Sequence, residues 1–228
     1  MLYGELPQVT TPSGETLNGV TVRYSNPPKS AVLRLPSNQE MIERLSLHKS
    51  IRRTIGRRKS QMESIPNLKA DLDLFNLIRL DKGGVEFDEY EASDSIGKIT
   101  YNEVTDYTTE EGGAFVTHSG CERVGDQYRI TLKTPFGTTT HTMNIPSRRD
   151  ITFYRRSVIS SIDLPHGQEE VRYRIEPAVT LYNAAVSAFD GYASSYKPED
   201  IPPHHKSSVI IELVQAIDEL DSILDPNS

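Results

Sequence analysis

The chain has 228 residues, of which 36% are hydrophobic and 25% charged, and its formal net charge at pH 7 is −7. This length can bury about 70% of the unfolded surface, enough for one large domain or two small ones. No apolar run approaches the roughly 20 residues of a membrane-spanning helix, and the first residues lack the basic and apolar regions of a secretory signal. The sequence therefore predicts a cytoplasmic globular protein without a membrane partner.

The composition also limits the kinds of functional site that the chain can contain. A single cysteine, Cys121, excludes an intramolecular disulfide and a zinc site with several thiolates, so a packing role is expected for it. The negative charge argues against a dedicated nucleic-acid binder, whose affinity comes largely from phosphate neutralisation. His204 and His205 lie in a proline-rich stretch without a third ligand at metal-site spacing and are predicted to belong to a linker. No cofactor and no enzymatic activity are predicted.

The first third of the chain predicts strands followed by a helix. Residues 6–35 alternate β-branched runs with turn sequences, which is typical of hairpins. Ser37 and Glu40 have the spacing of a capping box, so a helix is predicted to begin near Asn38 and to stop at Gly56. Its apolar face is expected to contain Met41, Ile42, Leu45, Ile51 and Ile55.

Two more helices are predicted in the middle of the chain. The first follows Pro66 and ends at the glycines of residues 83–84, where a left-handed cap is needed. A weaker one is predicted from about Asp88. The first of them has its apolar residues at Leu68, Leu72, Phe75 and Ile78.

From about residue 101 the sequence returns to strand patterns. Gly125 and Asp126 separate two runs typical of a hairpin, and the turn sequence of residues 134–138 predicts one more reversal, so a meander of at least three strands is expected. Ser147 and Asp150 then repeat the capping-box spacing. The helix after them is predicted to carry Ile151, Tyr154, Val158 and Ile162 on one face.

The last quarter of the chain predicts a pair of helices. An irregular segment is expected over residues 163–177, and Pro177 is expected to open a helix that carries Val179, Tyr182, Val186 and Phe189. A polar linker over residues 191–207 precedes the final helix, whose apolar stripe fits either the core of the chain or the groove of a partner. This stripe consists of Ile210, Leu213, Val214, Ile217, Leu220 and Leu224.

Together these elements predict an α+β fold with two β-hairpin/helix units, a helical middle segment and a C-terminal helical pair. The predicted segments are 1–66 for the first hairpin and helix unit, 67–100 for the helical segment, 101–165 for the β-meander and helix unit, and 166–228 for the C-terminal helices.

The two hairpin/helix units share a short motif. "LRLPSNQEM" at residues 33–41 and "MNIPSRRDI" at residues 143–151 both place Pro-Ser after a strand end and an acid three residues after the serine. Proline ends strand pairing, serine binds free amides of the helix start, and the acid complements the helix dipole. Internal duplication and convergence both explain this echo, and both predict a hairpin that leads into a capped helix.

A family resemblance follows from these residues. The turn Thr11-Pro12-Ser13-Gly14-Glu15-Thr16, followed by Arg34-Leu35-Pro36-Ser37 and Glu40, resembles the tail assembly chaperones and related small morphogenesis proteins of long-tailed phages. The resemblance covers about the first 60 residues and, if the duplication is real, residues 128–162. It implies a non-enzymatic factor in the host cytoplasm that binds tape-measure or tube subunits.

The candidate contact residues lie in two places. A basic run of Lys49, Arg52, Arg53, Arg57, Arg58 and Lys59 fits a solvated helix end, a contact to an acidic protein, or a contact to nucleic acid, for which it lacks interleaved aromatic residues. The C-terminal stripe contributes Ile210, Leu213 and Ile217 as candidate partner-binding residues.

Three functions therefore remain open. The first is a tail morphogenesis factor that binds phage tail or other virion proteins, including further copies of itself. The second is a structural component of the virion head, neck or tail. The third is a nucleic-acid-binding regulator that uses the basic run, which the acidic composition makes the weakest of the three.

Overall fold

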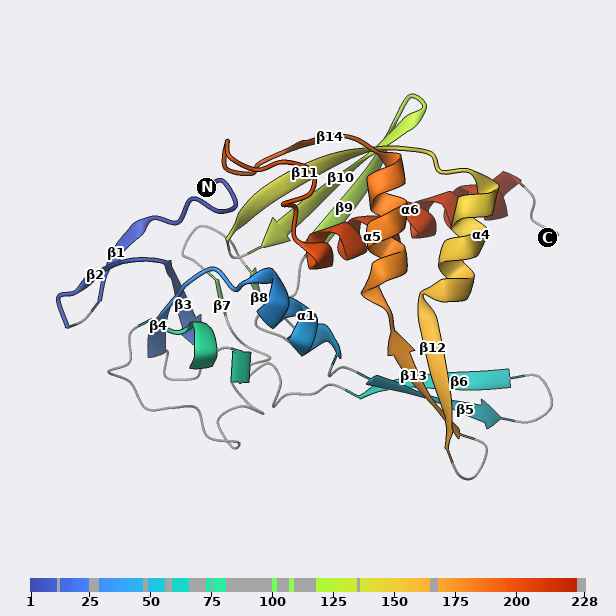
Figure 1. Cartoon of the computed structure of the whole chain (residues 1–228), viewed down its shortest axis with the longest axis horizontal. Helices are drawn as coiled ribbons and strands as arrows, with labels where there is room; N and C mark the ends of the chain where they lie inside the picture. Colours follow the sequence, from blue (N-terminus) through green and yellow to red (C-terminus); the bar gives the residue numbers. More distant parts are fainter. Residues whose placement is uncertain are drawn as a thin grey trace.

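The computed structural model describes residues 1–11, 13–24, 29–46, 49–55, 59–65, 73–74, 76–80, 100–101, 107–108, 118–134, 136–164 and 168–224. Within them the predicted α+β class is confirmed, because helices pack with several small antiparallel sheets (Figure 1). The helices are α1 (Asn38–Ser46), α4 (Arg148–Ser157), α5 (Ile175–Ala185) and α6 (Pro203–Leu224). The strands are β1 (Gln8–Thr10), β2 (Thr16–Asn18), β3 (Val20–Tyr24), β4 (Lys29–Leu33), β5 (Lys49–Ile55), β6 (Lys59–Ile65), β7 (Thr100–Tyr101), β8 (Tyr107–Thr108), β9 (His118–Val124), β10 (Gln127–Thr134), β11 (Gly137–Asn144), β12 (Ile159–Leu164), β13 (Gln168–Tyr173) and β14 (Val186–Asp190).

The N-terminal hairpins form as predicted. β1 pairs antiparallel with β2, and β3 pairs antiparallel with β4. In the turn between β1 and β2, the amide of Thr11 donates to the carbonyl of Glu15. The hydroxyl of Thr11 accepts from the amide of Glu15 at 3.2 Å. The side chain thus replaces part of the backbone pairing where the chain reverses.

The main sheet has the order β14-β11-β10-β9 and confirms the predicted meander. Gly125, with φ +64°, occupies the first position of the two-residue turn between β9 and β10, where a positive φ favours glycine. Along β10, Tyr128, Ile130 and Leu132 are buried, whereas Arg129 is exposed. This alternation with period two assigns one face of the sheet to the core.

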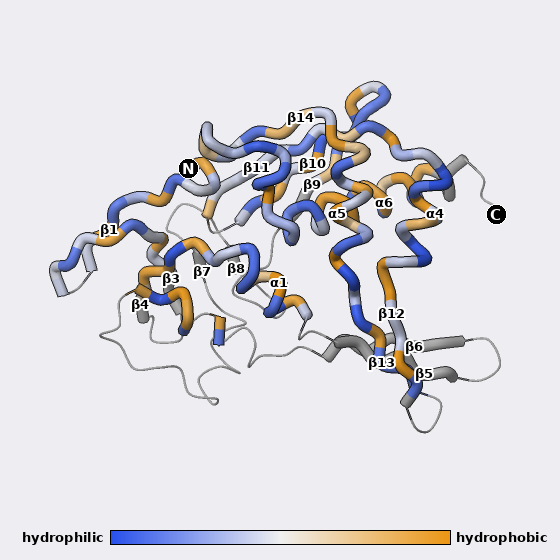
Figure 2. The backbone as a smooth tube through the Cα atoms, viewed as in Figure 1, coloured by the Kyte–Doolittle hydropathy of each residue, from blue (hydrophilic) through white to orange (hydrophobic). Residues whose placement is uncertain are grey.

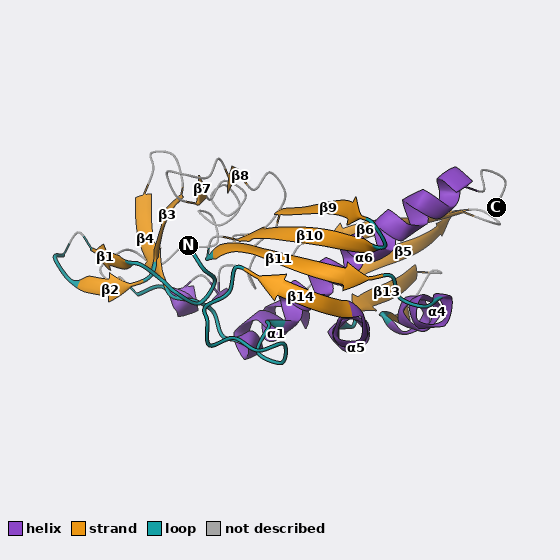
Figure 3. Cartoon of the chain, turned by 90° about the horizontal axis from the view of Figure 1, so that it is seen from above, coloured by secondary structure: helices purple, strands orange, loops and turns teal. Residues whose placement is uncertain are grey.

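Helices cover that inner face. α6 packs against β9 and β10, α5 packs against α6, and α4 packs against α5. Figure 3 shows the four strands side by side with α6 passing beneath them, and Figure 2 shows hydrophobic residues recurring along α6. Ile210 and Leu213 are fully buried there, and each contributes about 1.5–3 kcal/mol by leaving water.

The helix predicted from Asn38 to Ile55 is wrong in its second half. α1 ends at Ser46, and residues 49–55 form β5, which pairs with β6 on one side and β13 on the other. Ile51, Thr54 and Ile55 are β-branched and suit a strand, and pairing on both edges outweighs the helical spacing of the two isoleucines.

Two other helices also end earlier than predicted. α4 stops at Ser157, so Ile162 lies in β12, and the segment predicted to be irregular forms the β12–β13 hairpin. α5 stops at Ala185, and the next residues form β14, which completes the edge of the main sheet beside β11. In both cases a β-branched residue, Val158 or Val186, is the C-cap, and the chain leaves the helix directly into a paired strand.

The middle of the chain is described only in part. Residues 73–74 and 76–78 are helical, with Leu74 and Ile78 buried, which agrees with the predicted second helix. Leu68, Leu72, Phe75 and the helix predicted from about Asp88 lie outside the described residues.

Another four-stranded sheet, with the order β12-β13-β5-β6, projects from the main sheet and the helices packed on it. Figure 1 shows it below α4 and α5, on the side away from the main sheet. The chain runs from α4 into β12 and returns through β13 into α5. Its central pairing joins residues 168–171 to residues 50–53. The strands of this projecting sheet therefore come from three of the four predicted segments, 1–66, 101–165 and 166–228.

Candidate functional site

The predicted basic run lies on the projecting sheet. Lys49, Arg52 and Arg53 belong to β5, and Lys59 is the first residue of β6. The interpretation of this run as a helix end is wrong for these residues, because they lie on strands, where successive residues alternate between two faces. Arg57 and Arg58 lie outside the described residues.

The neighbouring strand brings acidic residues to this run. In the β13–β5 register, Glu169 lies opposite Arg52 and Glu170 lies opposite Ile51. Opposite charges at facing positions stabilise an antiparallel pair, by roughly 0.2–1 kcal/mol. The register thus places the basic strand beside an acidic one within the same sheet, which lowers the net positive charge that a nucleic acid would meet.

The C-terminal stripe is placed in the core of the chain itself. Ile210 and Leu213 have no exposed surface, and Ile217 keeps 9%. They face the main sheet through the contacts of α6 with β9 and β10. The stripe was predicted to fit either the core of the chain or the groove of a partner. In the structure these three residues lie in the core.

The prediction that His204 and His205 belong to a linker is wrong. Both lie in the first turn of α6, which begins at Pro203, and His205 has no exposed surface. Proline suits the first helical position because its fixed φ fits the helix and its missing N–H would be unpaired there anyway. The proline pair that suggested an extended linker is thus the start of the helix.

His205 belongs to a buried network of tyrosine and histidine side chains. Its Nδ1 lies 2.7 Å from the hydroxyl of Tyr192, and that hydroxyl lies 3.3 Å from Nε2 of His141 on β11. Nδ1 of His141 in turn lies 2.8 Å from the hydroxyl of Tyr182 on α5. The ring of Tyr3 packs edge-on against His205, with 4.5 Å between centroids. The network therefore joins the N-terminal segment, the main sheet and two helices.

Burial keeps these histidines neutral. It lowers the pKa of His141 to about 4 and that of His205 well below the usual range, with the neighbouring histidines adding to the effect at His205. Burial, together with the charge of Arg44, lowers the pKa of His204 to about 3. His204 as a whole residue is only partly buried, although its Nδ1 is closed to solvent, whereas His141 and His205 have no exposed surface.

Two ring nitrogens in this region stand out. Within the described part of the chain, Nδ1 of His204 and Nε2 of His205 are buried without a hydrogen-bond partner. In the same part of the chain, no three histidine, cysteine or acidic side chains are placed to hold a metal ion together. Since His205 and His141 have no exposed surface, a solute in water does not reach them, and their evident role is to hold the packed elements together.

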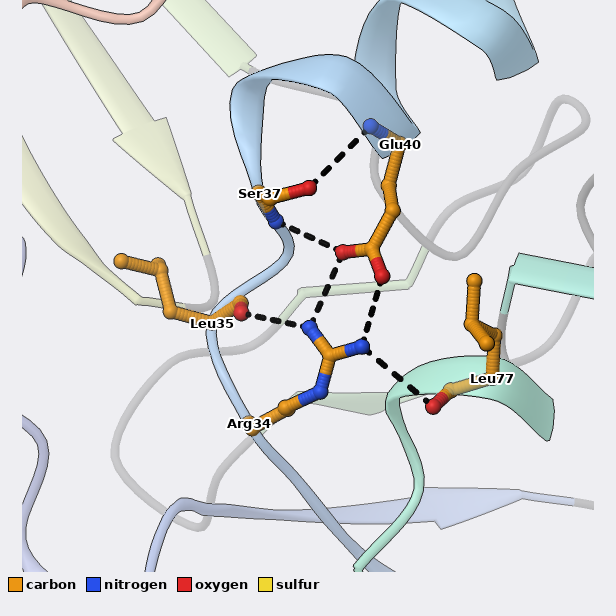
Figure 4. Close-up of polar contacts among 5 residues, drawn as sticks. All are labelled: Arg34, Leu35, Ser37, Glu40 and Leu77. Carbon is orange, nitrogen blue, oxygen red and sulfur yellow. Dashed lines mark hydrogen bonds and ion pairs between the residues drawn. The ribbon is translucent and has the colours of Figure 1, made fainter.

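The first copy of the Pro-Ser echo forms the capping box that the sequence predicts (Figure 4). The Glu40 amide donates to the Ser37 hydroxyl at 3.2 Å, and the Ser37 amide donates to Glu40 Oε2 at 2.7 Å. Arg34 adds a two-pronged ion pair, with N–O distances of 2.9 and 2.6 Å to the same carboxylate, and donates to the carbonyl of Leu35. These donors, the Arg34 bonds foremost, lower the pKa of Glu40 to about 2.

The second copy is a weaker version of the same cap. The Asp150 amide donates to the Ser147 hydroxyl at 3.2 Å, but the hydroxyl then donates to Asp150 Oδ2 at 2.6 Å. The aspartate, one methylene shorter than glutamate, thus bonds the serine side chain. Asn144 takes the place of Arg34 two residues before the proline, and its side chain accepts from Gln127 instead.

Among the described strands, β12 forms a free edge of the projecting sheet, and this edge is a candidate binding feature. β12 is the outermost strand on its side, with β13 as its partner. Ile162 in β12 keeps 52% of its surface exposed, and Ile159 keeps 41%. Only one of its six residues, Asp163, is charged. A strand edge of this kind offers unpaired backbone groups together with apolar side chains.

Comparisons with protein-family models, with curated proteins and with solved structures find no match to this chain. No helix among the described residues combines the length and the apolar character needed to cross a bilayer.

Proposed function

We propose that this chain is a non-enzymatic factor of phage tail morphogenesis that acts like a tail assembly chaperone. It binds tape-measure or tube subunits in the host cytoplasm and keeps them from polymerising early. The residues that make the contact lie on the projecting sheet, which carries Lys49, Arg52, Arg53 and Lys59 of the basic run and the free edge of β12.

The observation that carries this proposal is the open edge of β12. Many proteins bind extended segments by adding a strand to such an edge, with main-chain hydrogen bonds for affinity and side-chain contacts for specificity. Natural edge strands are commonly protected by lysine, proline or bulges. The sequence Ile-Ser-Ser-Ile-Asp-Leu of β12 has no lysine and no proline, and it presents Ile162 to solvent.

A second observation supports a role in assembly. The hairpin and capped-helix unit on which the resemblance to tail assembly chaperones rests occurs twice, at β3–β4–α1 and at β10–β11–α4, although the second β region departs from the pattern of that family. Arg34, which belongs to the resembling motif, binds both carboxylate oxygens of Glu40 and so fixes the first unit.

A structural virion component is the second candidate, because the same β12 edge serves equally well in a permanent contact. The two candidates differ in where the chain ends up. A chaperone leaves before the particle is complete, whereas a component stays at a fixed number of copies.

The test is co-expression of the tagged chain with its neighbouring genes, followed by purification and mass spectrometry. We expect recovery of tape-measure or tube subunits from cells before assembly, and no peptides of this chain in finished particles. Presence in finished particles would replace the chaperone with the structural component. Recovery of no virion protein in either sample would overturn both.

A further inference from the structure

The outer face of α4 carries an aromatic ring in solvent. Phe153 keeps 63% of its surface exposed, the largest fraction among the exposed large hydrophobic residues of the described part of the chain. The opposite face of this helix is well packed, since Ile151 and Tyr154 are both buried. The exposure of Phe153 is therefore a property of this face and does not come from loose packing of the helix.

Two arginines flank this ring. Arg149 and Arg156 lie four residues before and three residues after Phe153, so all three share one side of the helix. Among the described residues, neither guanidinium has an ion-pair partner, whereas Arg155 pairs with Asp218. We call Arg149, Phe153 and Arg156 the α4 surface.

The local charge is opposite to that of the whole molecule. α4 contains four arginines and one aspartate, Asp150, which is engaged by the capping hydroxyl of Ser147. The whole chain has a net charge of −7. An unpaired cationic patch on an acidic protein is a complementary surface for carboxylates, which guanidinium groups bind with two parallel hydrogen bonds.

Further apolar surface continues past the end of the helix. α4 leads into β12, where Ile159 is 41% exposed, and its partner across the strand pair, Tyr173, is 44% exposed. Figure 1 and Figure 3 show α4 beyond α5 at the end of the row of helices, which leaves its outer side open among the described elements.

We propose that the α4 surface binds an acidic segment of another polypeptide that carries a bulky apolar side chain. Carboxylates of the segment pair with Arg149 and Arg156, and its apolar side chain packs on Phe153. Aromatic and arginine residues dominate the binding energy of many interfaces, and here an exposed ring stands between two guanidinium groups that have no ion-pair partner among the described residues. The inference concerns a surface distinct from the β12 edge and holds whether or not the partner is a virion protein.

A polypeptide fits this surface better than a nucleic acid. Of the exposed apolar neighbours, Ile159 is aliphatic and does not stack with bases, and the ring of Tyr173 lies beyond the helix on β13, with its hydroxyl hydrogen-bonded to Tyr154 and Ser207. The acidity of the rest of the chain opposes a nucleic acid more than a short acidic segment, because a nucleic acid carries a charge on every nucleotide and extends beyond these arginines.

The test is selection of binders from a yeast-displayed library of random 16-residue peptides with the full chain as bait. Peptides that also bind the triple variant Arg149→Glu, Phe153→Ala, Arg156→Glu are removed. We expect the remaining peptides to be enriched in Asp or Glu together with aromatic or large aliphatic residues. In titrations of one selected peptide, Phe153→Ala should weaken binding at least tenfold, whereas Leu77→Ala, at a side chain 58% exposed, should leave it unchanged.

Several results would overturn the inference. One is a selection whose binders all tolerate the triple variant, and another is a set of variant-sensitive binders without acidic residues. If the chain binds the oligonucleotide (dT)20 more tightly than it binds the selected peptide, and Phe153→Ala abolishes that binding, the surface would be assigned to nucleic acid. Dimerisation of the chain that the same variant abolishes would assign it to a second copy. Thermal melts of each variant separate loss of binding from loss of folding, and an unfolded variant is replaced by Phe153→Ser with the arginines retained.

Discussion

At the residue scale, Tyr192 is the link between two buried histidines. Its hydroxyl lies 2.7 Å from His205 Nδ1 and 3.3 Å from His141 Nε2. His205 has no other hydrogen-bond partner, since its Nε2 is buried and unpaired within the described part of the chain. Removal of this one hydroxyl therefore leaves the His205 ring with no polar partner, which is costly in a site closed to water.

Tyr192→Phe should lower the free energy of unfolding by about 1–3 kcal/mol, the cost of leaving a buried polar group unsatisfied. Urea denaturation at pH 7.5 measures it. Tyr196→Phe is the matched control, because the Tyr196 ring packs on Tyr192 but its side chain is only partly buried. A loss at Tyr192→Phe no larger than the loss at Tyr196→Phe would show that the hydroxyl contributes nothing.

Substitution of Gly14 and of Gly191 by alanine distinguishes the cost of backbone strain from the cost of steric overlap. Both have positive φ, +86° and +84°, but a Cβ at Gly191 would overlap the carbonyl of Thr138, whereas a Cβ at Gly14 meets open space. Gly14→Ala should cost about 1 kcal/mol from backbone strain alone. Gly191→Ala should cost at least about 2 kcal/mol more, because β11 must move. Equal melting temperatures of the two variants would contradict this assignment.

At the element scale, the two helix caps have the same spacing and different strengths. Glu40 binds the Ser37 amide and both terminal nitrogens of Arg34. Asp150 binds only the Ser147 hydroxyl through its side chain among the contacts of the described residues. The difference follows from two positions, because Asn144 stands where the first copy has Arg34, and the shorter Asp150 stands where it has Glu40.

Glu40→Gln should destabilise the protein by about 1 kcal/mol at pH 7, a value discounted for the partial exposure of Arg34. The pKa of Glu40 is lowered to about 2 in the fold, so its contribution is complete above its ordinary pKa of 4.5 and is lost as the pH falls from there toward 2. Asp150→Asn should cost less than half as much. Urea midpoints of both variants test the order, and a larger loss at Asp150→Asn would contradict it.

The elements that sequence predicted best are those fixed by local chemistry. The capping serines, the Gly125 turn and the stripe of α6 all specify structure through residues that are close in sequence. The errors at β5, β12 and β14 share one cause: each strand forms by pairing with a distant segment, and a helical spacing of isoleucine or valine does not exclude a strand.

Signals for these strands were nevertheless present. Pro165 and Gly167 separate two short runs that contain β-branched residues, as expected of a hairpin, and Thr54–Ile55 extends such a run in β5. The buried network was harder to foresee, because His141, Tyr192 and His205 are far apart in sequence and polar. Pro203 as a helix start indicated only that the histidine pair belongs to a helix.

At the scale of the whole molecule, the tyrosine and histidine network holds distant segments together. Tyr3 donates its amide to the carbonyl of Gly191 and accepts from the amide of Ala193, so the N-terminal segment lies along the loop after β14. Its ring then packs on Tyr192 and His205. The stability of the whole fold therefore depends on keeping these histidines neutral.

This dependence predicts acid sensitivity. Histidine in the unfolded chain titrates near pH 6.5, whereas the pKa of His141 is lowered to about 4 and that of His205 further. Between pH 6.5 and 4 the unfolded chain therefore binds more protons than the folded chain. The free energy of unfolding should decrease as the pH falls through this window, by up to about 1.4 kcal/mol per pH unit for each histidine. Urea midpoints from pH 7.5 to 5 measure the slope, and His205→Gln should reduce it. A slope unchanged by that variant would contradict the assignment.

We propose that the free edge of β12 binds virion subunits before assembly. The most direct measurement compares tagged wild type with Ile162→Lys and Val124→Lys in co-expression with the neighbouring genes, with captured subunits quantified by mass spectrometry. Val124 is a matched control on β9, with 46% of its surface exposed against 52% for Ile162. We predict that Ile162→Lys loses at least nine tenths of the captured tape-measure or tube subunits while Val124→Lys retains them. Equal capture by the folded variants would contradict the claim.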